Sequence, residues 1–246
     1  MRSCSVCRDI EIVPGGMDDY KKLAHYHYRN SRLGPFAAIF ALRPTAALKW
    51  QADTDCLGVI VYTMPNPHVE LRSLATAGLF AGIDRDTQLS LVNKNIRRIA
   101  RVVVEPRFRG LGLAARLVRE TMPKMDVPII EALAVMGLVN PFFEKAGMQA
   151  YTAGTPQRCV RLIEALSSIG IEDSSLINPR KVQDGISRLD KDRGRFIERE
   201  ISLFLQSYGK RRRMSPGFNR TKFVLSRLTE RPAYYIWFKP DMELRI

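Results

Sequence analysis

The sequence has no long hydrophobic run. No uninterrupted apolar stretch approaches the ~18 residues that a membrane-spanning helix needs. The first nine residues also lack the apolar segment of a secretory signal. We therefore expect a soluble, cytoplasmic protein with no membrane partner.

Cysteine is scarce, with four residues in the chain. Their number and scatter exclude a disulfide framework for a domain of this size. Cys4 and Cys7 have the spacing of half a zinc site, which His25 and His27 could complete, but the other two cysteines are isolated. We favour reduced thiols and expect no metal.

Internal repeats and low-complexity segments are absent as well. Hydrophobic residues make up 46% of the 246 residues and charged residues 26%, which excludes wholesale disorder. The length suits one sizeable domain, or one domain with a large appendage.

Acidic residues are in deficit, with 25 Asp and Glu against 39 Lys and Arg, a net charge of +14. The excess lies in two blocks. Residues 94–119 carry 8 basic and 1 acidic residue, and residues 180–246 carry 17 basic and 8 acidic residues. Such a field attracts polyanions, namely nucleic acid, an anionic membrane surface or a phosphorylated cofactor, whereas the alternative is a merely solvated basic surface.

The second block contains four adjacent cations, Lys210, Arg211, Arg212 and Arg213. Adjacent cations need counter-ions, and a nucleic-acid backbone supplies closely spaced phosphates. We expect these four residues to bind nucleic acid, with DNA favoured over RNA.

Hydrophobic patterning predicts alternating strands and short helices up to Tyr151, and helices beyond it. Asp18 is the expected N-cap of a helix that runs through Tyr28. Strands are expected at 8–13, 36–42, 57–64, 99–104, 127–136 and 233–238. Helices are expected at 87–92, 112–122, 141–146, 156–169, 180–190, 192–208 and 217–229.

The most informative stretch follows the strand at 99–104. Pro106 stops that strand, and a loop with Gly110 and Gly112 leads at once into a helix. Glycines let a ligand approach closely, the first helix amides are unsatisfied donors, and Arg107 and Arg109 add charge. The arrangement suits a pyrophosphate, although a tight strand-to-helix turn explains it as well. No Gly-Lys-Ser/Thr follows, and the full Gly-x-Gly-x-x-Gly is missing, so the loop is neither a Walker loop nor a dinucleotide-binding turn.

Two motifs in order resemble the GNAT acyltransferase superfamily. Val-Val-x-Pro followed by Arg107-x-x-Gly110-x-Gly112-x-Ala114 is similar to its acetyl-CoA-binding motif. The segment from Asn140 to Met148 is similar to its Asn-x-x-x-x-Phe-Tyr-Glu-Lys-x-Gly-Phe element, and residues 129–135 look like the strand between them. The clear similarity covers residues 97–151, and a weaker match covers 8–64.

The resemblance implies an α/β fold with a mixed, mostly antiparallel sheet flanked by helices. Residues 1–154 are then the GNAT acyltransferase core, 155–231 a basic helical insertion or subdomain, and 232–246 a terminal strand that returns to the core sheet.

The resemblance also implies that acetyl-CoA, or a related acyl-CoA, is the acyl donor. Its pyrophosphate is expected on the loop, and its pantetheine arm on the preceding strand where two central strands splay apart. The donor-binding residues implied are Val102, Val103, Val104, Arg107, Phe108, Arg109, Gly110, Leu111, Gly112, Leu113, Asn140 and Phe143.

The sequence departs from the family pattern at the proton-transfer groups. Phe143 stands where the family has its usual acid, a tyrosine, and Asn95-Ile96-Arg97-Arg98 lacks the carboxylate often found before the loop strand. Candidate substitutes are His25, His27 and Glu131. A structural histidine, a Glu131 that pairs with an arginine at the core edge, and direct attack with solvent relay are the alternatives.

Three functions fit these features. The favoured one is acyl transfer to an exocyclic or modified base amine in nucleic acid, since His25 and its neighbours faintly resemble the His-Tyr element of phage Mom-type DNA-modifying proteins. A similar order of motifs occurs in GNAT modules fused to transporter-like ATPases. The alternatives are an acetyltransferase for a protein lysine or small amine, and a non-catalytic GNAT-like protein that binds nucleic acid.

Overall fold

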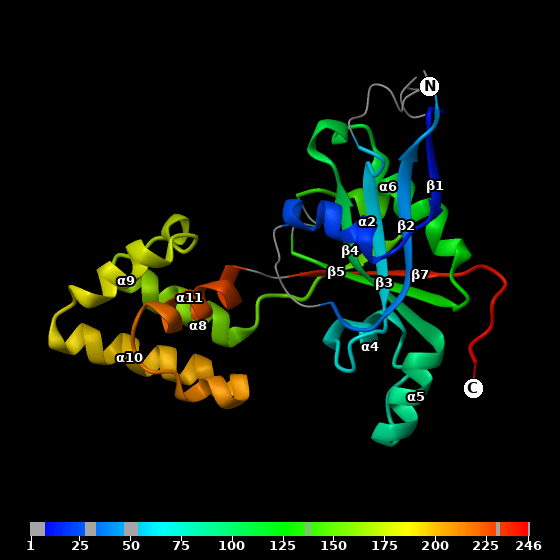
Figure 1. Ribbon diagram of the computed structural model, residues 1–246. Coiled ribbons are helices and arrows are strands. Elements are labelled where there is room, and N and C mark those ends of the chain that lie inside the picture. Colours follow the sequence, from blue (N-terminus) through cyan, green and yellow to red (C-terminus); the bar gives the residue numbers. More distant parts are fainter. Residues whose placement is uncertain are drawn as a thin grey trace. The chain divides into compact units, whose positions relative to one another are not determined.

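The computed structural model describes residues 8–27, 33–46, 54–135, 137, 139–229 and 232–245 (Figure 1). The chain divides into two compact units. The core unit comprises Met1–Thr152 and Pro232–Ile246, and the helical unit comprises Ala153–Arg231. The chain therefore leaves the core unit once and returns to it for its last strand.

The core unit contains a seven-stranded mixed sheet in the order β1-β2-β3-β4-β5-β7-β6. Its strands are β1 (Ile10–Pro14), β2 (Phe36–Pro44), β3 (Gly58–Thr63), β4 (Ile96–Val104), β5 (Ile129–Ala134), β6 (Gln149–Tyr151) and β7 (Ala233–Phe238). Neighbouring strands are antiparallel except β4 and β5, which are parallel. The predicted mixed, mostly antiparallel sheet is confirmed. β7 lies between β5 and β6, so a strand from the end of the chain completes the sheet.

The described helices of the core unit are short. They are α2 (Met17–Leu23), η1 (Ala24–Tyr26), α4 (Glu70–Ala75), α5 (Arg85–Asn95), η2 (Pro106–Phe108), α6 (Leu113–Thr121), η3 (Met122–Lys124) and α7 (Phe142–Lys145). The helical unit contains α8 (Gln157–Ser168), η4 (Asp173–Ser175), α9 (Pro179–Ser187), α10 (Lys191–Leu205), η5 (Gln206–Arg213) and α11 (Phe218–Thr229). No helix among these described segments is long and apolar enough to span a bilayer.

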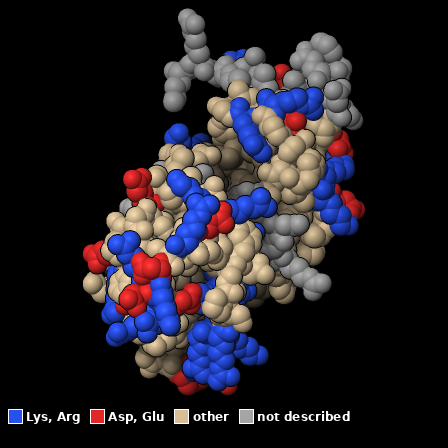
Figure 2. Space-filling view, turned by 90° about the vertical axis from the view of Figure 1, so that its left-hand side faces the viewer, with Lys and Arg blue, Asp and Glu red and all other residues tan. Residues whose placement is uncertain are grey.

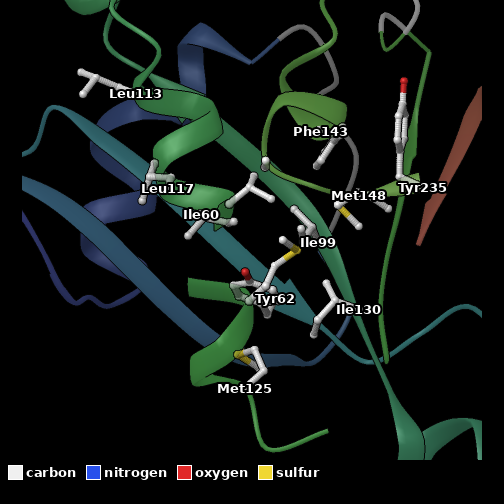
Figure 3. Close-up of a cluster of buried hydrophobic side chains, with 14 of the residues drawn as sticks. Ile60, Tyr62, Ile99, Leu113, Leu117, Met125, Ile130, Phe143, Met148 and Tyr235 are labelled. Carbon is white, nitrogen blue, oxygen red and sulfur yellow. The ribbon is translucent and has the colours of Figure 1, made fainter. Parts of the chain in front are cut away.

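Both faces of the sheet are covered. On one face, Leu113 and Leu117 of α6 and Phe143 of α7 pack against Ile60 and Ile130 (Figure 3). On the other face, α2 packs through Leu23 against β3, and α4 and α5 pack against β4, β5 and β7. The alternation of side chains along a strand puts adjacent β7 residues on opposite faces, so Tyr235 joins the α6 side and Tyr234 the α4 side.

The helical unit has a core of its own. Fifteen buried side chains, among them Leu162, Ile197, Phe204 and Val224, form one cluster from α8, α9, α10, α11 and the segment between α8 and α9. Their spacing of three and four residues explains why residues beyond 155 read as amphipathic helices.

The predicted cap at Asp18 is wrong. Helix α2 begins at Met17, with Gly16 as its N-cap, and the Gly16 amide donates to Asp19 Oδ2 at 2.9 Å. The carboxylate three residues into the helix, rather than a side chain at the cap, therefore satisfies this end. The helix gives way to η1 after Leu23, and the predicted end at Tyr28 lies outside the described residues.

Candidate functional site

The loop between β4 and α6 is held at its base by backbone hydrogen bonds. The Glu105 amide donates to the Leu57 carbonyl at 2.9 Å, which fixes the end of β4 against the start of β3. Pro106 opens the turn η2, and the Phe108 amide closes it on Glu105 O at 3.0 Å. The start of the loop is therefore rigid, and the glycines that follow stand on a fixed support.

Gly110 and Gly112 both have left-handed backbone, with φ of +82° and +76°. A Cβ at either position would meet no atom within 4 Å. Crowding therefore does not explain the glycines. The positive φ does, because residues with a side chain rarely adopt it, and the open space leaves the backbone accessible to a ligand.

Helix α6 begins directly after this turn, with Gly112 as its N-cap. The first amide bonded within the helix is that of Arg116, which donates to Gly112 O at 3.0 Å. The amides of the first turn precede it and, by their position, have no acceptor inside the helix. Leu113 and Leu117 anchor the helix in the core, so these donors and the positive end of the helix dipole face the loop from a fixed position.

The two loop arginines are exposed but tethered. Arg107 Nε donates to Glu105 Oε1 at 2.8 Å, and Arg109 Nε donates to the Val104 carbonyl at 3.1 Å. The Arg107 side chain is 54% exposed and that of Glu105 8%. Glu105 therefore partly neutralises Arg107, while Arg109 adds a positive charge at the last residue of β4.

β4 and β5 separate beside this loop. Only Ile96–Ile99 of β4 pairs with Ile129–Ala132 of β5, although β4 continues to Val104. Within the described residues, the stretch from Arg101 to Val104 has a strand partner on one side only, β3. The predicted donor-binding residues Val102, Val103 and Val104 lie on this stretch, so part of their backbone hydrogen-bonding capacity faces an opening between two strands.

A β-bulge stands where the opening starts. Val61 pairs with Arg101 but its neighbour Tyr62 pairs with Ile99, so Ala100 has no partner in β3. A bulge of this kind bends the strand and leaves one residue's backbone groups outside the ladder. The bulge, the end of the β4–β5 pairing and the glycine loop therefore form one continuous feature.

Glu131 lies in a buried polar cluster on the α4 side of the sheet. Arg72 of α4 donates to it from Nη2 to Oε1 at 2.8 Å and from Nε to Oε2 at 2.9 Å, and Tyr234 donates to Oε2 at 3.0 Å. Arg72 also donates to the Asn66 carbonyl at 2.7 Å, and Arg98 Nη1 donates to Asn66 Oδ1 at 2.7 Å. Burial lowers the pKa of Arg72, but its bonds to Glu131 outweigh this, and the pKa is raised overall.

The structure shows Glu131 as the partner of a buried arginine. Its side chain is 1% exposed, and both oxygens accept hydrogen bonds from a fixed cation. A carboxylate held in this way has no free access to a substrate proton. The alternative expectation, that Glu131 pairs with an arginine, is what the structure contains.

His25 and His27 lie at the end of the α2–η1 segment. His25 is exposed and its ring centroid lies 3.9 Å from that of Tyr26, while the His27 amide donates to Ala24 O at 3.1 Å. η1 lies close to β4, on the face opposite α6. η1 therefore approaches β4 from the side of the sheet opposite the helix that follows the glycine loop, and His27 follows η1 directly.

Asn140 and Phe143 lie in the connection from β5 and in α7. Asn140 is exposed and its carbonyl accepts from the Phe142 amide at 2.9 Å. Phe143 is 4% exposed and stacks on Tyr235, with ring centroids 4.9 Å apart. Phe143 is thus first of all a core residue.

Tyr235 and Arg72 are neighbours of the site that the sequence analysis missed, because Tyr235 lies over 90 residues from α7 and Arg72 lies in a segment without clear patterning.

The basic run Lys210–Arg213 lies on the surface of the helical unit, in η5. Gly209, with φ of +52°, turns the chain before it. Arg211 places its guanidinium 4.6 Å from the Phe223 ring centroid, and Arg227 approaches the same ring at 5.2 Å. Within the described part of the chain, none of the four cations of this run forms an ion pair. Figure 2 shows Lys and Arg side chains outnumbering carboxylates on one face of the molecule.

Carboxylates in the helical unit pair with other arginines. Asp190 and Asp192 bind Arg193 and Arg195, and Glu200 binds Arg161 at 2.6 Å. Glu198 binds Arg220. These ion pairs all use carboxylates of α10 or its N-cap, and each binds an arginine outside the run in η5.

No cluster of three or more His, Cys, Asp or Glu suited to a metal occurs in the described segments. Cys4 and Cys7 lie outside them. No protein-family model matches the chain, and no curated protein matches its sequence.

Proposed function

We propose that this chain is a GNAT-type acyltransferase that moves an acetyl or related acyl group from acyl-CoA to an amine of nucleic acid, with a base amine of DNA as the favoured acceptor. One observation carries the proposal. The unpaired edge of β4 runs directly into a two-glycine loop at the N-terminus of α6. Together these elements offer an extended track that ends in a phosphate-sized cradle.

The cradle suits the diphosphate of an acyl-CoA. The open space over Gly110 and Gly112 admits phosphate oxygens up to the backbone, and the first-turn amides of α6 and its dipole favour negative charge there. Arg107 and Arg109 add positive charge at the rim. The loop residues from Phe108 to Leu113 are therefore the ones that would hold the diphosphate.

The track suits the pantetheine arm. Its amides are extended, and an open strand edge pairs with amides of an extended chain as it pairs with another strand. Val102–Val104 lie along such an edge where β4 leaves β5, and the Val104 carbonyl at its end accepts from Arg109 Nε. Along this track the reactive carbonyl comes to the bulge at Ala100. The Ala100 amide lies outside the β3 ladder and suits a donor to the oxygen that gains negative charge, while the Ala100 carbonyl accepts from Arg101 Nη1 at 2.8 Å.

The bound acyl-CoA supplies an activated carbonyl, and the protein supplies position and proton transfer. His25 and His27 are the candidate bases for the incoming amine, because η1 lies close to β4 on the face opposite α6. Glu131 is not assigned this role. With Arg72 it fixes α4 against β5 and so supports the wall of the opening.

The charge of the helical unit favours nucleic acid as the acceptor. Lys210–Arg213 are exposed and carry no ion pair within the described residues, and phosphate backbones attract such surfaces. A small cationic amine is attracted instead to acidic surfaces. This chain has a net charge of +14, which repels such an amine.

The proposal is tested by two measurements made together. Purified protein is incubated with acetyl-CoA and duplex DNA that contains all four bases, and free thiol is followed over time. The nucleosides are then examined by mass spectrometry for an added acetyl group. Thiol release with a modified nucleoside supports the proposal. Thiol release only with a protein or polyamine acceptor points to the alternative substrate class, and DNA binding without thiol release points to a non-catalytic protein.

A further inference from the structure

The ring at the family's usual acid position has no hydroxyl, but its neighbour does. Phe143 lies in α7, and the Tyr235 ring of β7 stacks on it with a centroid distance of 4.9 Å and an interplanar angle of 32°. Figure 3 shows the two rings beside each other, with the Tyr235 hydroxyl pointing out of the hydrophobic cluster. The Tyr235 phenol therefore lies next to Phe143, the position at which the family usually has a tyrosine.

Register places Tyr235 beside the start of the opening. Tyr235 pairs with Ala132 of β5, and Ala132 is also the last β5 residue that pairs with β4. Side chains of β7 at this register therefore stand one strand away from the point where β4 and β5 separate. The stacking on α7 puts the Tyr235 ring on the α6 face of the sheet.

The hydroxyl of Tyr235 has a carboxylate partner and tight surroundings. It donates to Glu144 Oε1 at 3.2 Å, and Glu144 Oε2 is buried with no hydrogen bond to any described residue. A Cβ on Gly137, in the connection that follows β5, would lie 2.4 Å from the hydroxyl oxygen. Only glycine lets that backbone pass so close to the phenol, so the hydroxyl lies directly against the β5–α7 connection.

Among the described residues, two further tyrosines are fully buried, and their hydroxyls bond to other groups. Tyr62 shares a hydrogen bond of 2.7 Å with Thr121 of α6, within the core. Tyr234 faces the α4 side and donates to Glu131. Neither ring lies against Phe143, so Tyr235 is the buried phenol that the stacking singles out.

We propose that Tyr235, held by Glu144 and by stacking on Phe143, is the group that donates a proton to the departing sulfur in the acyl transfer. This role rests on the proposed function. Proton donation is then the role of a residue in β7, because Phe143 in α7 has no hydroxyl.

The proposed step moves one proton and one acyl group. The amine nitrogen forms a bond to the carbonyl carbon, the carbon–sulfur bond breaks, and its electron pair leaves on sulfur. The Tyr235 hydroxyl gives its proton to that sulfur, and the proton lost by the amine nitrogen returns to the tyrosine oxygen. The products are the amide and the free thiol, and the tyrosine ends as it began.

The surroundings keep the phenol protonated before this step. Burial, followed by the charge of Glu144, raises the pKa of Tyr235 to about 12. The proton is therefore present at neutral pH, and the carboxylate favours its rapid return after transfer.

Kinetics of three variants test the role. Tyr235→Phe removes the hydroxyl and keeps the ring, and we expect kcat for thiol release to fall about 100-fold, the lower range for loss of a general acid, with coenzyme A affinity unchanged. Tyr62→Phe, which removes a buried hydroxyl on the same face, is the matched control and keeps its kcat. Adding Phe143→Tyr to Tyr235→Phe places a phenol on the neighbouring ring. We expect kcat of this double variant to be at least tenfold higher than that of Tyr235→Phe alone.

A second readout needs no turnover. Protein labelled with 3-fluorotyrosine is titrated with coenzyme A or with desulfo-coenzyme A, and the Tyr235 resonance is assigned from its loss in Tyr235→Phe. We expect coenzyme A to shift this resonance and desulfo-coenzyme A to shift it much less, while the Tyr234 resonance stays in place.

The outcomes separate the two proposals. Wild-type turnover with an unaffected Tyr235→Phe variant, or a Tyr235 resonance that does not respond to bound sulfur, overturns the role of Tyr235 and leaves the proposed function standing. Absence of thiol release by the wild type with every acceptor overturns the proposed function and this role together.

Discussion

The core unit and the helical unit use their basic side chains in different ways. In the core unit, Arg72 binds a buried carboxylate, and Arg107 and Arg109 donate to acceptors at the end of β4. In the helical unit, the run Lys210–Arg213 is exposed, and no ion pair of its members occurs in the described residues. Guanidiniums bound to carboxylates and carbonyls fix the geometry of a small site, whereas cations without a carboxylate partner act through their field on a large polyanion.

We therefore expect the two blocks of positive charge to have separate functions. The block at residues 94–119 runs through β4, the glycine loop and α6, and Arg107 and Arg109 of this block lie in the loop itself. The block beyond residue 180 lies mostly in the helical unit, which has its own hydrophobic core. Changes to one block are therefore expected to leave the function of the other block intact.

The largest effect is expected from Gly110→Val. A β-branched residue at φ of +82° is strained by about 1–3 kcal/mol, and the loop relieves this strain by moving its amides. We expect coenzyme A binding to become undetectable by calorimetry while DNA binding is kept. Gly170→Val is the matched control, since Gly170 of the helical unit has φ of +85° and equally open space. Equal loss of coenzyme A binding in both variants would mean that strain anywhere in the chain, and not this loop, is responsible.

The next effect concerns stability. Glu131→Gln leaves Arg72 buried without its counter-ion, and breaking a buried pair in this way costs about 3–5 kcal/mol. We expect urea unfolding to show a loss of this size. The paired replacement Arg72→Met with Glu131→Leu should recover much of it, because no buried charge remains. A full loss of thiol release in Glu131→Gln without any loss of stability would instead return Glu131 to the list of candidate bases.

A smaller effect is expected from neutralising Arg211, Arg212 and Arg213 as glutamine. Each lost phosphate contact lowers the slope of log affinity against log salt by about 0.9, so the DNA affinity should fall and its salt dependence flatten by up to about 3. Arg193→Gln with Arg195→Gln is the control, because these arginines already pair with Asp190 and Asp192. Similar losses in both variants would show that net charge alone, rather than the run in η5, attracts DNA.

The smallest effect is the pH dependence of stability. Burial raises the pKa of the Cys56 thiol to about 11, and it raises the pKa of Tyr235 to about 12. Because the folded protein keeps these groups neutral, their contribution is complete below about pH 9 and is lost as pH rises through these values. Urea unfolding at pH 8 and pH 10.5 should show lower stability at the higher pH, and Cys56→Ala should reduce the difference. Equal stability at both values would contradict the assignment.

Much of the core unit could be predicted from the sequence, because apolar β-branched runs carry their own signal. The strands at 99–104 and 57–64 are found within a few residues of their expected bounds, as β4 and β3. β6, with three residues and two of them exposed, has no such signal and was not predicted. It exists because β7 offers it an edge, and an edge supplied from the end of the chain is invisible to local patterning.

In the candidate site too, local features could be predicted from the sequence and contacts between distant residues could not. The glycine loop is a local feature, so its position after β4 and before α6 could be predicted from Pro106, Gly110 and Gly112. The role of Glu131 depends on Arg72, 59 residues away, and the stacking on Phe143 depends on Tyr235 in the last strand. Such pairs are set by tertiary packing, which neither residue type nor spacing encodes.

A crystal structure of the complex with coenzyme A tests the central claim most directly. The account predicts that the diphosphate accepts hydrogen bonds from backbone amides between Phe108 and Leu113 and that the pantetheine arm lies along Val102–Val104. A diphosphate bound at any other part of the chain, or no binding at millimolar coenzyme A, would contradict it.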